Sequence, residues 1–129
     1  KVLLIDDNHV DNTINKFLTT QFDLAENIIV KNSAIEALKM LTEEKSEFPE
    51  LIFLDINMPE MNGFGFLEEF TKLSKKRNEK SMIAMLTSSQ DEADIEKAKQ
   101  YSCVIAYIIK PLTKSKLSDL ELSVDKSLI

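Results

Sequence analysis

Short hydrophobic runs alternate along the chain with longer segments in which apolar residues recur every three or four positions. The runs have the length of buried parallel strands and span residues 2–5, 28–30, 51–54, 82–86 and 104–109. The segments between them have the period of helices that bury one face. This alternation predicts repeated β–α units, and therefore an α/β fold built on one parallel sheet.

Five helices are expected from the same pattern. The residues expected to cap their amino-terminal ends are Asn8, Ser33, Ser89 and Thr113. The second helix is expected to run to about Glu44 and the fourth to about Tyr101. The apolar positions that share a helical face are Val10, Ile14, Phe17 and Leu18 in the first helix; Ile35, Leu38 and Leu41, expected to be buried, in the second; Phe66, Leu67, Phe70 and Leu73 in the third; Ala93, Ile95 and Ala98 in the fourth; and Leu117, Leu120, Val124 and Leu128 in the fifth. The stripe of the fourth helix is thin, which predicts a weakly anchored and movable element.

Polar side chains follow four of the five hydrophobic runs directly. Asp6 and Asp7 end the first run and Asp55 the third, while Thr87 and Lys110 end the fourth and fifth. In an open α/β sheet, ligands bind just beyond the carboxyl ends of the strands. We therefore expect three carboxylates, a hydroxyl and an amine to meet at one edge of the sheet.

This set of groups suits a divalent metal ion and a phosphoryl group. Clustered carboxylates repel one another unless a cation neutralises them or one of them is protonated. Oxygen ligands without His or Cys favour Mg²⁺ or Mn²⁺ over zinc. The only glycines, Gly63 and Gly65, stand together, so the chain has no glycine-rich phosphate loop. Taken alone, the acidic pair would equally well cap a helix, and the prediction depends on all four strand ends together.

Composition narrows the class of protein further. With 129 residues, 43% hydrophobic and 29% charged, the chain is long enough for one domain with a real core. Its net charge of -6 argues against direct binding to nucleic acid, which needs a basic face. The single Cys103 excludes an internal disulfide and a cysteine-based zinc site. The single cysteine also fits a reducing environment, so we expect a cytoplasmic protein. No apolar stretch is long enough to cross a bilayer, so we expect no membrane partner.

Four motifs, taken in order, resemble those of the response-regulator receiver domains of two-component signalling. They are Asp6-Asp7; the segment Asp-Ile-Asn-Met-Pro-Glu-Met-Asn-Gly at 55–63; Thr87-Ser88; and Tyr107-Ile-Ile-Lys-Pro111. The resemblance covers nearly the whole chain and implies a single receiver domain over residues 1–129. It also implies a flavodoxin-like fold, a three-layer α-β-α sandwich whose five parallel strands have the order 2-1-3-4-5.

The resemblance assigns the residues that hold the metal and accept the phosphoryl group. It implies that Asp55 is the phosphoacceptor and that Asp7 binds Mg²⁺ directly. It further implies that Asp6 helps to hold the ion through water, and that the backbone carbonyl of Asn57 is a metal ligand. An aspartate carboxylate can serve as a nucleophile that forms an acyl phosphate, which is consistent with the first of these roles.

The resemblance also assigns the residues that respond to the phosphoryl group. Thr87 would bond it through its hydroxyl, Lys110 would pair with it, and Tyr107 would turn inward as an aromatic switch. The expected partner is a sensor histidine kinase or a histidine phosphotransfer protein. A homodimer through the fourth helix, fifth strand and fifth helix is a further expectation. Receiver domains often have small residues in the turn before the last strand, whereas this chain has Ile105 there, which would add apolar surface to that face if it were exposed.

Two alternatives stay open at this point. One is a binding module that keeps the fold without being phosphorylated, although every site position is intact. The other is a phosphohydrolase of the haloacid-dehalogenase type, which also uses an aspartate nucleophile with Mg²⁺. Those enzymes carry the nucleophile on the first strand and a second Asp two residues later, whereas here the acidic pair comes first and Asn57 stands two residues after Asp55. We therefore expect a signalling phosphoacceptor rather than a turnover enzyme.

Overall fold

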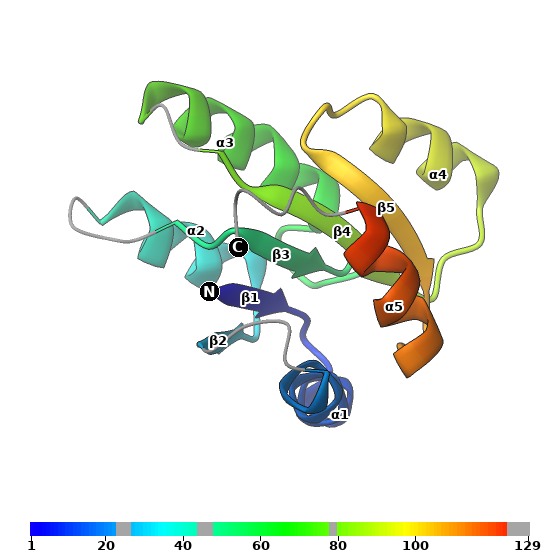
Figure 1. Ribbon diagram of the computed structural model, residues 1–129. Helices are drawn as coiled ribbons and strands as arrows, with labels where there is room; N and C mark the ends of the chain where they lie inside the picture. Colours follow the sequence, from blue (N-terminus) through cyan, green and yellow to red (C-terminus); the bar gives the residue numbers. More distant parts are fainter. Residues whose placement is uncertain (23–26, 44–47, 78–79, 124–129) are drawn as a thin grey trace.

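The computed structural model describes residues 1–22, 27–43, 48–77 and 80–123, in which strands and helices alternate strictly (Figure 1). The strands are β1 (Val2–Ile5), β2 (Ile28–Lys31), β3 (Leu51–Leu54), β4 (Met82–Thr87) and β5 (Val104–Ile109). The helices are α1 (His9–Gln21), α2 (Ala34–Thr42), α3 (Gly63–Lys76), α4 (Glu92–Lys99) and α5 (Lys114–Ser123). All strand pairs are parallel and their order is β2-β1-β3-β4-β5, which confirms the predicted flavodoxin-like topology.

Two separate cores flank the sheet and give the predicted three layers. Helices α2, α3 and α4 cover one face, while α1 and α5 cover the other (Figure 1). Along β1, Leu3 and Ile5 enter the first core, and Val2 and Leu4 enter the second. Strands covered on both faces bury every side chain, which explains why β1, β3 and β4 are continuous hydrophobic runs.

Helix α1 turns three of its four predicted apolar residues to solvent, while the fourth, Leu18, packs partly buried against the second core. Its predicted cap is confirmed, because the Asn8 side chain accepts a hydrogen bond from the Asp11 amide at 3.0 Å. Its buried side chains, however, lie on the opposite side and are polar: Asn12, Asn15 and Thr19. Its most exposed apolar side chains are Val10 at 64%, Ile14 at 50% and Phe17 at 60%. The reversal is helped by two hydrogen bonds to backbone: the Asn12 amide donates to the Asp6 carbonyl at 2.7 Å, and the Thr19 hydroxyl donates to the Asn15 carbonyl at 2.7 Å.

Two predicted details of α2 and α4 are wrong. Ile35 of α2 is exposed rather than buried, because the small side chains Ala34 and Ala37 face the sheet in its place. The cap of α4 is Asp91 rather than Ser89, since the Asp91 carboxylate accepts from the Ala93 amide at 3.0 Å. The thin packing of α4 is confirmed, because its buried residue is the small Ala98; the helix ends at Lys99.

Helix α5 matches its prediction within the described residues. Thr113 accepts from the Lys116 amide at 3.2 Å, and Leu117 and Leu120 are buried. Val124 and Leu128 lie outside the described residues, as does Glu44, whereas α2 itself ends at Thr42.

Strand β5 contains a bulge at its start. Ile83 pairs with Val104 and Ala84 with Ala106, so Ile105 is an extra residue between two ladder pairs. Ile105 is half-buried against the core that faces α5. It therefore adds less apolar surface to the face of α4, β5 and α5 than full exposure would.

Candidate functional site

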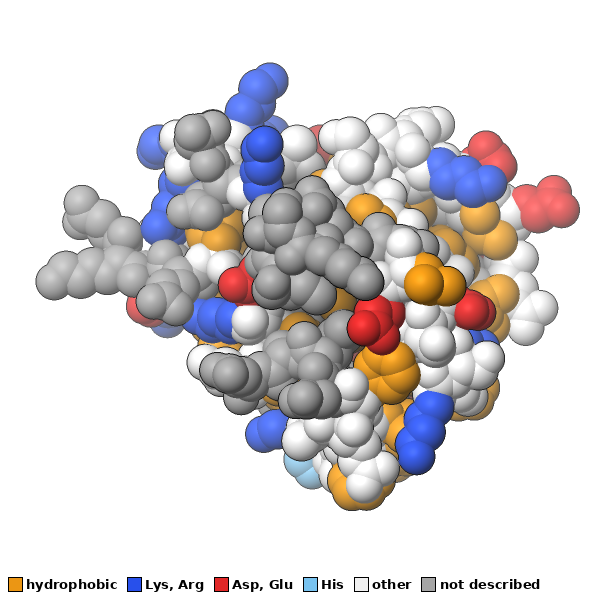
Figure 2. Space-filling model, in the orientation of Figure 1, with side chains coloured by type: hydrophobic (Ala, Val, Ile, Leu, Met, Phe, Trp, Pro, Cys, Tyr) orange, Lys and Arg blue, Asp and Glu red, His pale blue; other side chains and the backbone are white. Residues whose placement is uncertain are grey.

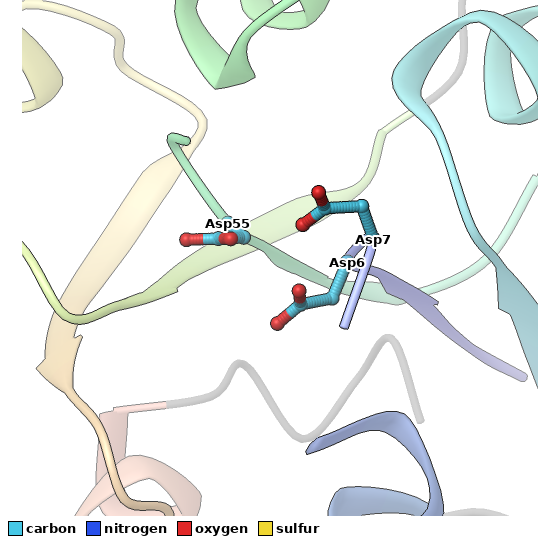
Figure 3. A group of neighbouring side chains, drawn as sticks. All are labelled: Asp6, Asp7 and Asp55. Atoms are coloured by element: carbon cyan, nitrogen blue, oxygen red, sulfur yellow. The ribbon is translucent and has the colours of Figure 1, made fainter. Parts of the chain in front are cut away.

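Three carboxylates meet beyond the ends of two central strands. Asp6 and Asp7 follow β1, Asp55 follows β3, and Figure 3 shows their carboxylate groups pointing to the same side. One oxygen from each lies within 4.8 Å of the others. Asp6 and Asp55 are buried, whereas Asp7 is exposed. The parallel pairing of β1 with β3 explains the convergence, because it brings both strand ends to the same level.

The Lys110 ammonium lies among carboxylates at the same edge. Its Nζ atom is 2.6 Å from Asp6 Oδ2, 2.8 Å from Asp11 Oδ2 and 3.8 Å from Asp55 Oδ2. The Lys110–Pro111 peptide bond is cis. Sequence reasoning did not find Asp11, although its place in the first turn of the helix that follows the acidic pair is a signal that could have suggested it.

The pKa values in the cluster follow from this crowding. Burial raises the pKa of Asp55, and the nearby Asp6 charge raises it further, while Lys110 and a hydrogen bond from Thr87 act in the opposite direction. Burial alone would lower the pKa of Lys110, but hydrogen bonds to Asp11 and Asp6 and the Asp55 charge raise it above its ordinary value. One ammonium thus leaves the carboxylates short of positive charge. An all-oxygen donor set with this shortage fits Mg²⁺ or Mn²⁺.

A chain of hydrogen bonds leads from Thr87 to β5. Thr87 is fully buried, and its hydroxyl oxygen accepts from the Ser89 amide at 3.3 Å. The Tyr107 hydroxyl donates to the Ser89 carbonyl at 3.0 Å, and the Ser89 hydroxyl donates to Asp94 on α4 at 2.6 Å. A displacement of Thr87 would therefore alter, through Ser89, the hydrogen bonds that hold Tyr107 and α4.

The loop from Asp55 to Gly63 holds the nucleophile candidate in place. Asp55 Oδ1 accepts from the Ile56 amide at 2.8 Å, and the Gly63 amide donates to the Ile56 carbonyl at 2.8 Å. Glu60 takes a φ of 66°, a backbone conformation that non-glycine residues rarely adopt. Asn57 lies exposed in this loop, two residues after Asp55.

Known proteins with similar sequences identify the family of this chain. The family model of the response regulator receiver domain matches residues 2–120. The chain belongs to this family. Receiver domains are signalling domains that interact with histidine kinases or phosphotransfer proteins, and they typically bind Mg²⁺. The described part of this receiver domain contains no helix with the length and apolar character needed to span a bilayer.

Similar proteins include both short and long relatives. The chain is 31% identical over 123 residues to a "Chemotaxis protein CheY homolog" of Campylobacter jejuni, covering 92% of this chain and 90% of that protein. It is 26% identical over 125 residues to "Hybrid signal transduction histidine kinase L" of Dictyostelium discoideum. This match covers 93% of the present chain but only 7% of the kinase. A solved two-component response regulator from Cytophaga hutchinsonii has a TM-score of 0.85 and 34% identity, covering 95% of this chain and 94% of that one.

Proposed function

We propose that this receiver domain accepts a phosphoryl group on Asp55 from a histidine of a sensor kinase or phosphotransfer protein. The observation that carries the proposal is the convergence at one sheet edge of a buried carboxylate, an ammonium and a hydroxyl. Lys110 Nζ lies 3.8 Å from Asp55 Oδ2, and the Thr87 hydroxyl acts to lower the pKa of the same carboxyl group. We also propose that residues 1–129 form a single domain that acts as a switch rather than as a turnover enzyme.

The proposed step is a displacement at phosphorus. An Asp55 carboxylate oxygen attacks, an O–P bond forms, and the P–N bond to the donor imidazole breaks, after which the imidazole takes a proton from solvent. Lys110 and Thr87 bind phosphoryl oxygens as charge builds on them. Magnesium, held by Asp7, Asp55 and the Asn57 carbonyl with Asp6 acting through water, would supply further neutralisation of that charge when bound.

The proposed response begins at Thr87. A phosphoryl group on Asp55 attracts the Thr87 hydroxyl, which the Ser89 amide contacts in the unphosphorylated form. The Ser89 carbonyl in turn holds Tyr107, so the loop before α4 and the Tyr107 ring move together. Because α4 is thinly packed, it is the element whose position the new charge can shift most readily.

Intact-mass spectrometry after incubation with acetyl phosphate or phosphoramidate and Mg²⁺ tests the phosphorylation. We expect the mass of one phosphoryl group to be added, to depend on Mg²⁺, and to be lost in Asp55→Asn. Asp94→Asn, which removes a carboxylate outside the cluster, should still be phosphorylated. No gain in a chain that binds Mg²⁺ would favour the phosphorylation-independent binding module, and a gain at another residue would refute the assignment of Asp55.

We further propose that the donor protein docks on the exposed apolar side of α1. Figure 2 shows hydrophobic side chains at the lower end of the view, over this helix. Val10, Ile14 and Phe17 are spaced as one helical stripe, and α1 begins directly after the acidic pair. A protein that brings its histidine to Asp55 therefore passes next to this stripe, and burial of large apolar side chains would stabilise the complex.

Phe17→Ser is expected to slow transfer from a phosphohistidine protein about tenfold, because a buried aromatic contact would be lost. Its phosphorylation by acetyl phosphate should not change, since Phe17 is not part of the acidic edge. Leu122→Ser is the matched control, because Leu122 of α5 is another exposed apolar residue. Rapid-mixing kinetics with the best donor from a panel of phosphotransfer proteins would measure both rates, and equal losses in the two variants would exclude docking on α1.

We also propose a homodimer that forms through the face of α4, β5 and α5. It is supported by a surface depression of about 260 Å³ between β5 and α5, lined in part by Tyr107, Ile109 and Leu120. Light scattering of the phosphorylated and unphosphorylated protein would test it.

A further inference from the structure

We propose that Asp11 is a positioning residue that holds the Lys110 ammonium away from Asp55 until phosphorylation. The inference rests on the proposed function, because it concerns the readiness of the same site to accept a phosphoryl group. Asp11 stands outside the four motifs that identify the site in the sequence, and it reaches the site from α1.

The distances divide the three carboxylates around Lys110 into two classes. Asp6 and Asp11 lie 2.6 and 2.8 Å from Nζ, which is hydrogen-bonding distance. Asp55 lies 3.8 Å away, beyond a hydrogen bond although within reach of an ion pair. The ammonium is therefore shared by Asp6 and Asp11, and the proposed nucleophile holds it least closely.

The helix fixes Asp11 in this role. Asp11 lies in the first turn of α1, where its amide is bonded to the Asn8 side chain, so its backbone cannot follow Lys110. Its side chain is about one third exposed, whereas that of Lys110 is 17% exposed. The hydrogen bond from Lys110 to Asp11 is also the leading influence that raises the pKa of the lysine against the effect of burial.

Phosphorylation would add a second group that competes with Asp11 for the Lys110 ammonium. When the O–P bond to Asp55 forms and the bond to the leaving group breaks, the new phosphoryl oxygens attract Lys110. To reach them, Nζ has to give up its 2.8 Å contact with the fixed Asp11 carboxylate. Asp11 thereby favours the unphosphorylated arrangement, and removing its charge should make the site easier to phosphorylate.

The test compares initial phosphorylation rates with acetyl phosphate at saturating Mg²⁺, followed by intact mass. Asp11→Asn is expected to react about fivefold faster than the wild type, the factor that one partly exposed ion pair can contribute. Asp11→Glu, which keeps the charge, should lie nearer to the wild type. Glu92→Gln removes the same charge from the first turn of α4 and should leave the rate unchanged. An unchanged or lower rate in Asp11→Asn, or an equal gain in Glu92→Gln, would overturn the proposal.

A second readout needs no phosphorylation. The side-chain ¹⁵N resonance of Lys110, assigned by its disappearance in Lys110→Met, should shift in unphosphorylated Asp11→Asn and stay in place in Glu92→Gln. An unshifted resonance in Asp11→Asn would show that the two groups do not pair and would refute the inference. If the resonance shifts but the wild type takes up no phosphoryl group, the failure lies with the proposed function and not with the pairing.

Discussion

Replacing Gly63 by Ala is expected to destabilise the fold by about 3 kcal/mol and to slow phosphorylation of Asp55 about tenfold. A Cβ atom at this position would lie 2.5 Å from the Asp55 carbonyl oxygen and 2.9 Å from the Ile56 Cα atom. Both atoms are backbone, so no side chain can rotate to relieve the contact. The strand end that carries the proposed nucleophile would have to move, and the hydrogen bond from Gly63 to Ile56 would stretch with it.

Gly65→Ala is the matched control for this prediction. Its Cβ atom would meet the Met61 side chain at 2.9 Å, and a flexible methionine can yield at little cost. Alanine also has the higher helix propensity, and Gly65 lies within α3. Urea unfolding of both variants, with phosphorylation rates by intact mass, would measure the contrast. Unfolding of Gly63→Ala at the same urea concentration as Gly65→Ala would show that the loop adapts freely to the added methyl group.

The sheet could be predicted from the sequence because the pattern that identifies each strand lies within the strand itself. Strands such as β1 and β3 are buried on both faces, so their residues form continuous hydrophobic runs that end at the functional carboxylates. Parallel strands also bring their carboxyl ends to one edge, which explains why the sequence alone predicts that Asp6, Asp55 and Lys110 lie close together.

The orientation of α1 could not be predicted in the same way. Its apolar stripe favours burial of Phe17, yet the structure buries Asn12 because the Asn12 amide can bond the Asp6 carbonyl. That partner is fixed by tertiary structure and is not visible in the period of the helix. The same limit applies to Asp11, whose partner Lys110 lies 99 residues further along the chain.

Replacing Lys110 by Met is expected to destabilise the protein by about 3 kcal/mol in Mg²⁺-free buffer, because it leaves buried carboxylates without their cation. Lys110 is only 17% exposed, and the side chains of Asp6 and Asp55 are 6% exposed, so water screens their repulsion poorly. Methionine keeps the length and the apolar stem of the lysine, which limits the change to the charge. Lys99→Met is the control, since Lys99 is 67% exposed and pairs with Glu96 at 3.6 Å, and its loss should be close to zero.

Two further conditions make the Lys110→Met result specific to charge. Adding Mg²⁺ should restore much of the lost stability, since a cation that binds only the folded cluster stabilises it by mass action. Lowering the pH should also reduce the difference in unfolding free energy between Lys110→Met and the wild type. The pKa of Asp55 is raised in the folded protein by burial and by Asp6, so the charged cluster is unfavourable above this pKa and is relieved by protonation as the pH falls through it. Urea midpoints with EDTA or Mg²⁺ at several pH values would measure all three effects. A deficit that neither Mg²⁺ nor acid reduces would mean that Lys110 stabilises the fold by packing rather than by neutralising carboxylates.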